Sequence, residues 1–176
     1  ADMQDAAAMR AALQGCDGVL HAAASVNLDP AQAAATLQNN LAGVRNVLGA
    51  ACALGLPHLL YVSSLSVLFQ ADQARLDENT PLASSRNAYT QSKTAAERLV
   101  RSWQAAGKPI ISSYPAAILG PDDPGLCESN AGLLTFASKT LPITRTGFQF
   151  VDVRDLAAIH AQLLSQPHTG SPTDWR

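Results

Sequence analysis

Residues 58–64 read His-Leu-Leu-Tyr-Val-Ser-Ser, an apolar run of strand length that ends in two serines. A short, uninterrupted apolar run is typical of a strand that is covered on both faces. Long alanine-rich segments flank it, and we expect helices over residues 31–54 and 87–106, which stop at Gly55 and Gly107. A buried strand between two long helices favours an α/β fold over an all-β sandwich.

The same alternation continues outward from this strand in both directions. The remaining expected elements are a helix at 5–14, strands at 18–24 and 110–114, a helix near 132–139, an extended piece at 148–151 and a helix at 153–164. Strands and helices that alternate at this spacing predict a doubly wound, Rossmann-like parallel sheet with helices on both sides. Asp29 and Pro30 form the expected start of the long helix. The polar tail at 166–176 is expected to fray.

Composition excludes several classes of function. The 176 residues carry a net charge of -2, which argues against nucleic acid, whose backbone requires a basic face. No apolar run reaches the roughly 18 residues of a membrane span, so no membrane partner is expected. The three cysteines are widely spaced and the histidines lack metal-ligand spacing, so we expect no metal and a reducing, cytoplasmic location.

The sharpest chemical feature is Tyr89 and Lys93, four residues apart on an expected helix and therefore on one face. A nearby ammonium favours the phenolate, so Lys93 is expected to lower the pKa of Tyr89 and make it a tunable proton donor or acceptor. Ser63 and Ser64 end the preceding strand, where a hydroxyl can bind a substrate carbonyl. The plainer alternatives are that Lys93 pairs with Glu97 on a solvated face and that the two serines form only a turn.

Ligands of parallel α/β sheets bind beyond the carboxyl ends of the strands. Three segments occupy that position here, namely residues 22–25, 63–69 and 115–120. Around them a series of motifs runs along nearly the whole chain. In order these are Asp2-Met3, His21-Ala22-Ala23-Ala24, Asn40 with Gly43 and Asn46, Tyr61-Val62-Ser63-Ser64, Asn87 to Lys93, Pro115 to Pro121, and Phe150 to Ala157.

This order and spacing resemble the extended short-chain dehydrogenase/reductase family, also called the NAD-dependent epimerase/dehydratase family. The resemblance implies an enzyme that uses NAD or NADP, with Tyr89 as acid/base and Lys93 tuning it and holding the nicotinamide ribose. Ser64 is implied as the catalytic serine, with Ser63 as the fallback, and Asn40 as a support for the lysine through water. The implied cofactor-binding residues are Asp2, Met3, Ala22, Ala23, Ser63, Tyr89, Lys93, Pro115 and Ile118.

The largest departure from the family is that the chain has no glycine-rich G-x-x-G-x-x-G turn to bind a dinucleotide pyrophosphate. The chain begins where the family's third strand ends, so the resemblance implies a member truncated at its N-terminus, without its first two βα units. The residue that separates NAD from NADP is missing with them. We expect a partial cofactor-binding domain over 1–125 and part of a small substrate-binding region over 126–176.

Smaller departures concern the substrate. Leu65-Ser66 follows the serines in place of the Asp-Glu pair of dehydratases, and Tyr114-Pro115-Ala116-Ala117 lacks the asparagine of sugar-nucleotide epimerases. These features favour a reductase with a small, apolar substrate. Two alternatives stay open, a sugar-nucleotide epimerase and a non-catalytic dinucleotide-sensing or interaction module. The long helices resemble those through which family members form homodimers, while His21 and His160 are expected to be structural.

Overall fold

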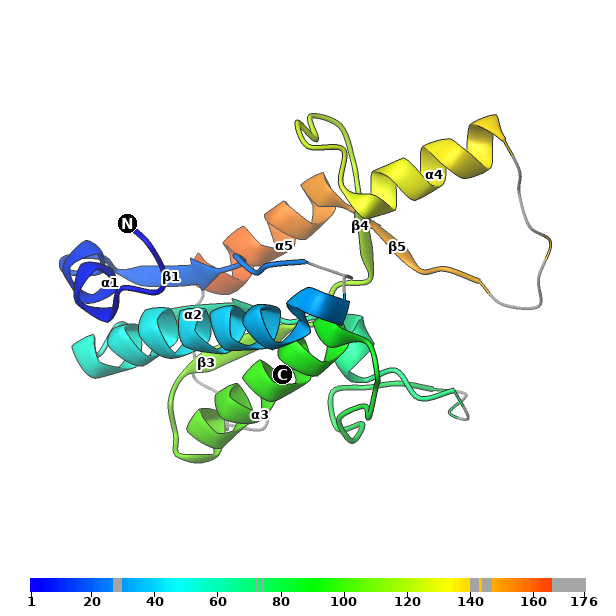
Figure 1. The fold of residues 1–176 in the computed structure, drawn as a ribbon. Coiled ribbons are helices and arrows are strands. Elements are labelled where there is room, and N and C mark those ends of the chain that lie inside the picture. The colour runs from blue at the N-terminus through cyan, green and yellow to red at the C-terminus, as the bar shows by residue number, and fades with distance from the viewer. Residues whose placement is uncertain (27–29, 72, 74, 140–142, 144–146, 166–176) are drawn as a thin grey trace.

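The computed structural model describes residues 1–26, 30–71, 73, 75–139, 143 and 147–165 (Figure 1). Helices and strands alternate as the sequence predicts, except that the strands Ile110–Ser113 and Ala117–Leu119 follow one another without a helix between them. In chain order the elements are α1 (Ala6–Ala12), β1 (Gly18–His21), a 3-10 turn (Pro30–Gln32), α2 (Ala33–Leu54), β2 (His58–Val62), a second 3-10 turn (Leu65–Val67), α3 (Ala88–Ala105), β3 (Ile110–Ser113), β4 (Ala117–Leu119), α4 (Glu128–Ser138), β5 (Phe150–Asp152) and α5 (Val153–Ser165).

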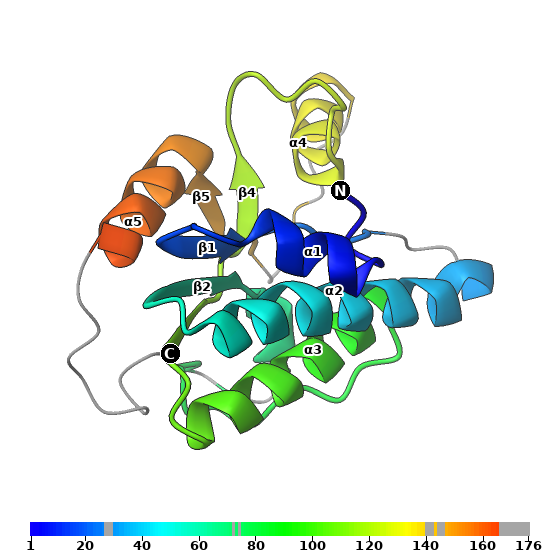
Figure 2. The same cartoon turned by 90° about the vertical axis from the view of Figure 1, so that its left-hand side faces the viewer.

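The central layer is a parallel sheet with the order β1-β2-β3. Helices α2 and α3 lie on one face of this sheet and α5 lies on the other, as Figure 2 shows. Four of the five residues of β2 are buried, as expected for a strand with neighbours on both edges and helices on both faces. The predicted Rossmann-like α/β fold with a parallel sheet is confirmed.

Helix ends follow from local side-chain and backbone chemistry. The carboxylate of Asp5 accepts hydrogen bonds from the amides of Ala7 and Ala8, both at 2.9 Å, and so caps α1. The side chain of Asn87 caps α3 in the same way by accepting from the amide of Thr90 at 3.0 Å. Gly55 ends α2 with φ at 72°, in the left-handed region that glycine adopts without strain.

The hydrophobic core lies between the sheet and the helices α2 and α3. Leu48 of α2, Val100 of α3, and Leu59 and Ile110 of β2 and β3 are all fully buried. Because these side chains are fully buried against one another, the ends of the strands have little freedom to move. The core therefore holds the carboxyl end of β2 and the first turns of α3 in a defined relation.

The structure corrects three expectations. Strand β1 ends at His21, so Ala22 to Ala24 follow the strand rather than belong to it. Helix α4 begins at Glu128, four residues before the predicted start. Residues 117–119, for which no element was expected, form strand β4, which pairs in parallel with β5. A three-residue strand is too short to show a periodic pattern, and it is defined by its partner some thirty residues later in the chain.

The predicted domain boundary at 125/126 stays a prediction. Strands β4 and β5 lie on opposite sides of that boundary and pair with each other, and α5 packs on β1 and β2 of the first sheet. Two further expectations, the helix start at Asp29 and the frayed tail at 166–176, lie outside the described residues. Within the described parts of the chain, no helix is long and apolar enough to cross a membrane.

Candidate active site

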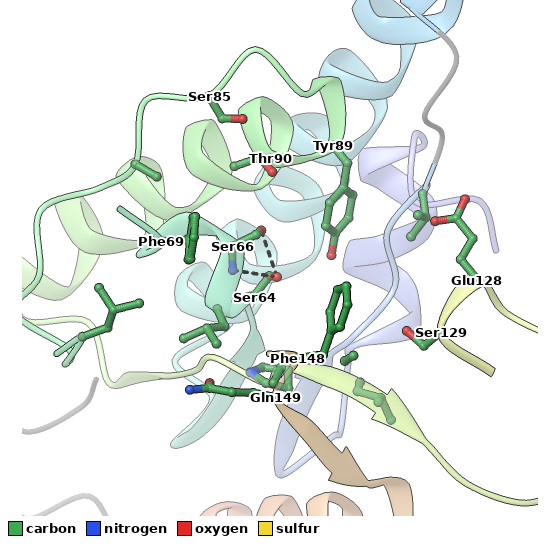
Figure 3. Close-up of a pocket in the computed structure, with 18 of the residues that line it drawn as sticks. Ser64, Ser66, Phe69, Ser85, Tyr89, Thr90, Glu128, Ser129, Phe148 and Gln149 are labelled. Atoms are coloured by element: carbon green, nitrogen blue, oxygen red, sulfur yellow. Dashed lines mark hydrogen bonds between the residues drawn. The ribbon is translucent and has the colours of Figure 1, made fainter. Parts of the chain in front are cut away.

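The chain leaves β2 and β3 side by side and stays paired beyond the ends of these strands. The amide of Ser63 donates to the carbonyl of Ser113 at 2.8 Å, and the amide of Leu65 donates to the carbonyl of Pro115 at 2.9 Å. These bonds place Ser64 and Pro115 at the same edge of the sheet. A cleft of about 1840 Å³ opens at this edge (Figure 3).

The walls of the cleft are mainly apolar, with hydroxyl and amide groups between the apolar side chains. Among the described lining residues, only Arg86 and Glu128 carry a full charge. The apolar walls come from Val26, Leu65, Phe69, Leu76, Leu82, Pro115, Ala116, Ala117, Ile118, Leu126 and Phe148. Apolar walls with a few convergent polar groups are typical of small-molecule sites.

Ser64 and Tyr89 bring their hydroxyls together in this cleft. Figure 3 shows the phenol of Tyr89 pointing from α3 toward Ser64 at the end of β2. The Ser64 oxygen accepts hydrogen bonds from the amide of Ser66 at 3.2 Å and from the hydroxyl of Ser66 at 3.0 Å. A serine oxygen that accepts from both groups can still donate its own proton. Ser63, the fallback, is buried with 3% exposure, so Ser64 is the serine that faces the cleft.

The expectation that Lys93 lowers the pKa of Tyr89 is wrong for this structure. Burial raises the pKa of Tyr89, and the opposing contribution comes from its hydrogen bond with Ser64. Removing a phenol from water disfavours the charged phenolate. Tyr89 is therefore held in its protonated form at neutral pH, which suits a group that donates a proton.

Lys93 lies beneath the cleft with 4% exposure. Its Nζ atom donates to the carbonyl of Val62 at 2.7 Å and lies 4.9 Å from the ring centroid of Tyr61. Burial lowers the pKa of Lys93 to about 8, and the charge of Glu97 works in the opposite direction. Both Lys93 and Glu97 are buried, so the alternative of a pair on a solvated face is wrong.

Asn40 joins three segments that are distant in the sequence. Its side-chain oxygen accepts from the amide of Ser25 at 2.7 Å, and its Nδ2 atom donates to the carbonyl of Ser25 at 3.0 Å and to the hydroxyl of Ser92 at 2.9 Å. Ser92 precedes Lys93 on α3. Asn40 thereby ties the loop after β1 to the helix that carries the Tyr-Lys pair, while its implied support of Lys93 through water stays a prediction.

The other residues implied in cofactor binding divide into two groups. Pro115 and Ile118 line the cleft beside Ser64 and Tyr89. Ala22 and Ala23 are exposed just after the end of β1. Asp2 and Met3 do not line the cleft. Asp2 is exposed and its carboxylate accepts from the amide of Gln4, and Met3 accepts from the side chain of Asn46 at 2.7 Å through its carbonyl.

The two histidines singled out in the sequence are buried, as expected for structural groups. His21 stacks on Tyr61 with ring centroids 6.0 Å apart, and burial lowers the pKa of His21 to about 4. The Nε2 atom of His160 lies 2.9 Å from the hydroxyl of Ser113 and so links α5 to β3. Among the described residues, no cluster of His, Cys, Asp or Glu side chains could hold a metal ion.

Sequence reasoning missed the residues that support the site from behind. Ser66 orients the Ser64 hydroxyl, and the ring of Tyr61 covers the Lys93 ammonium. Glu97 was weighed only as a surface partner. The four-residue spacing predicts that Glu97 lies one helical turn beyond Lys93. The spacing does not predict that Glu97 is buried, because its burial depends on strands elsewhere in the sequence.

Comparisons with known proteins agree with this geometry. The sequence model described as "NAD dependent epimerase/dehydratase family" matches residues 1–175. The chain is 31% identical over 186 residues to cinnamoyl-CoA reductase 1 of Arabidopsis thaliana, which covers 95% of this chain and 51% of that protein. It is 32% identical over 152 residues to a Synechocystis protein provisionally named a dihydroflavonol 4-reductase, covering 84% of this chain and 44% of that protein.

Solved structures show the same fold. The crystal structure of gox2253 has a TM-score of 0.82 at 30% identity and covers 94% of this chain and 52% of its own. A double mutant of DesIV, a dTDP-glucose 4,6-dehydratase of Streptomyces venezuelae with NAD bound, has a TM-score of 0.77 at 22% identity, with 94% and 53% covered.

The fold and the Ser-Tyr-Lys arrangement define the class of short-chain dehydrogenases and reductases that use a nicotinamide dinucleotide. Within that class, the chain belongs to the NAD-dependent epimerase/dehydratase family. It spans about half the length of the curated relatives that it matches.

The described residues fit the nicotinamide end of such a cofactor. The Lys93 ammonium has three N–H donors, and the bond to Val62 uses one of them. Tyr89, Pro115 and Ile118 face the same cleft. This sequence contains no glycine-rich G-x-x-G-x-x-G turn, the motif that binds a dinucleotide pyrophosphate.

Proposed function

We propose that this protein is an NAD(P)-dependent oxidoreductase that interconverts a carbonyl and an alcohol on a small, apolar substrate. The observation that carries the proposal is the meeting of the Ser64 and Tyr89 hydroxyls in an apolar cleft (Figure 3). Lys93, one helical turn after Tyr89, is buried. The curated reductases among its relatives support the reaction type. The scarcity of charge among the described lining residues supports the apolar substrate.

In this proposal each residue has a separate task. Ser64 donates a hydrogen bond to the substrate carbonyl oxygen and orients it, and it keeps its proton throughout. The bound nicotinamide supplies hydride to the carbonyl carbon. Tyr89 gives its proton to the same oxygen, which completes the alcohol and leaves a phenolate that recovers a proton from solvent. Burial raises the pKa of Tyr89, so its hydroxyl carries a proton at neutral pH and is available to donate it.

A Tyr89→Phe variant tests the proposal. In an intact version of the protein that includes the glycine-rich segment, loss of a positioned proton donor is expected to lower kcat by about 10²–10⁴-fold, while NADH or NADPH still binds. The measurement is the nicotinamide absorbance during turnover with a panel of aromatic and aliphatic ketones. Ser102→Ala, which removes an exposed hydroxyl from the same helix, is the matched control. Unchanged turnover in Tyr89→Phe would refute the proposal.

The same absorbance separates the alternatives. A reductase consumes cofactor steadily, whereas an epimerase returns it and gives product without a net absorbance change. A sensing module binds dinucleotide without product. The N-terminal truncation that the resemblance implies and a homodimer built on the long helices stay predictions. A reducing, cytoplasmic location is supported by Cys16, Cys52 and Cys127, all of which are free.

A further inference from the structure

Behind the cleft, helix α3 carries a second polar cluster that the proposed chemistry does not use. Glu97 is fully buried, and its Oε1 atom accepts hydrogen bonds from the hydroxyl of Tyr114 at 2.6 Å and from Nε of Arg101 at 3.0 Å. Its Oε2 atom has no hydrogen-bond partner among the described residues. Burying a carboxylate raises the free energy of the folded state unless the charge is paired. We therefore expect this buried group to have a function.

The cluster connects the three segments that form the site. Glu97 lies one turn after Lys93 and two turns after Tyr89 on α3. Tyr114 directly precedes Pro115, which lines the cleft, and the carbonyl of Pro115 accepts from the amide of Leu65 at 2.9 Å. Leu65 follows Ser64. A continuous path therefore runs from the helix of Tyr89 and Lys93, through Glu97 and Tyr114, to the segment of Ser64.

We infer that Glu97 is a positioning residue of this site, which holds α3 to the Pro115 segment through Tyr114 and places a fixed negative charge one helical turn from Lys93. The contacts themselves do not depend on any reaction. Only the identification of the cleft as an active site rests on the proposed function. The positive partner of Glu97 is Arg101, from the same helix.

The electrostatic half of the inference depends on what surrounds Lys93. His21 on β1 and Tyr61 on β2 interact with Lys93, and Glu97 acts on it from α3, while the uncharged Asn40 of α2 bonds to the neighbouring Ser92. Burial lowers the pKa of His21 to about 4, so that ring is neutral near pH 7, and burial raises the pKa of both Tyr61 and Tyr89. Glu97 favours the charged form of Lys93.

The charge is tested by titrating Lys93 directly. The chain has three lysines, and Lys108 and Lys139 are exposed, so ¹³C-labelled lysine gives three resolvable NMR signals with two internal references. The midpoint of Lys93 is expected near 8 in the wild type and at lower pH in Glu97→Gln. Glu78→Gln, which neutralises an exposed carboxylate, is the matched control and leaves the midpoint in place. If the titration midpoint of Lys93 is the same in Glu97→Gln as in the wild type, the claim that Glu97 favours the charged form of Lys93 is refuted.

The positioning half is tested with Tyr114→Phe, which removes one hydroxyl and keeps the carboxylate. We expect hydrogen exchange at the amide of Leu65 to accelerate by about five-fold, the equivalent of about one hydrogen bond. The amide of Ser63, bonded to Ser113 before the Tyr114 position, reports on general loosening of the sheet. Equal acceleration at both amides, or none at Leu65, overturns the positioning role.

These measurements need no turnover, so they separate the inference from the proposed function. An active wild type with an inactive Tyr89→Phe variant, together with an unmoved Lys93 midpoint in Glu97→Gln, would reject the inference alone. A shifted midpoint in a protein without any turnover would keep the inference and reject the proposed function. If Glu97→Gln does not fold, Tyr114→Phe still decides the positioning role.

Discussion

Replacing Asn40 by alanine is expected to destabilise the protein much more than the same change at the neighbouring Asn39. Asn40 is 4% exposed and makes three hydrogen bonds, two to the backbone of Ser25 and one to Ser92. Asn39 lies on the same helix and its side chain is exposed, and among the described residues no hydrogen bond to that side chain is found, while its backbone carbonyl accepts from the side chain of Gln4. Because both positions lie on the same helix, the difference between the two variants measures the contribution of the buried Asn40 side chain.

The magnitude follows from these contacts. Three hydrogen bonds at about 1 kcal/mol each correspond to about 3 kcal/mol of unfolding free energy. Alanine recovers roughly 0.5 kcal/mol through its higher helix propensity. We expect Asn40→Ala to lose about 2.5 kcal/mol, or about 5–10 °C in Tm for a domain of this size, and Asn39→Ala to be neutral or slightly stabilising.

Urea unfolding followed by circular dichroism measures both variants against the wild type. A loss below about 1 kcal/mol in Asn40→Ala, relative to Asn39→Ala, would refute the reasoning, since one hydrogen bond alone contributes about that much. Such a result would mean that the loop after β1 is not tied to α3 through Asn40.

Two further predictions concern stability. His21 binds a proton below about pH 4 when folded and below about pH 6.5 when unfolded, so stability falls as pH drops through this window, by up to about 3 kcal/mol. A His21→Phe variant is expected to show a shallower loss in urea unfolding at pH 4 to 6.5, and an unchanged slope would contradict the assignment. Gly18→Ala is expected to cost about 2 kcal/mol, because a Cβ atom there would lie 2.6 Å from the carbonyl oxygen of His58. Gly49→Ala, whose Cβ atom would lie 3.7 Å from Trp103, is expected to gain up to about 1 kcal/mol of helix stability. Equal changes in the free energy of unfolding at Gly18 and Gly49 would refute this pair of predictions.

Local features of the fold were predictable because their causes are local. The Tyr89-Lys93 pair shares a helix face by the helical repeat alone, and Gly55 and Gly107 mark helix ends because their positive φ angles suit glycine. The placement of Ser64 at a ligand-binding edge follows from the parallel order of strands, which the alternation of elements implies.

Other features depend on residues that are far apart in the chain. The bond between Asn40 and Ser92 spans 52 residues, and the strand at 117–119 exists through its pairing with β5. The direction of the Tyr89 pKa was also wrong from sequence, because the helical spacing to Lys93 gave no measure of how deeply the phenol is buried.

The sequence by itself determined the class of fold, the helix face of Tyr89 and Lys93, and the family, since periodicity, caps and motif order are written along the chain. Only the tertiary structure decided which serine faces the cleft and that Lys93 and Glu97 are both buried. The physical reason is that burial and charge environment depend on atoms brought together across the sheet. The chemistry of the Tyr89 hydroxyl depends on that environment as much as on its identity as tyrosine.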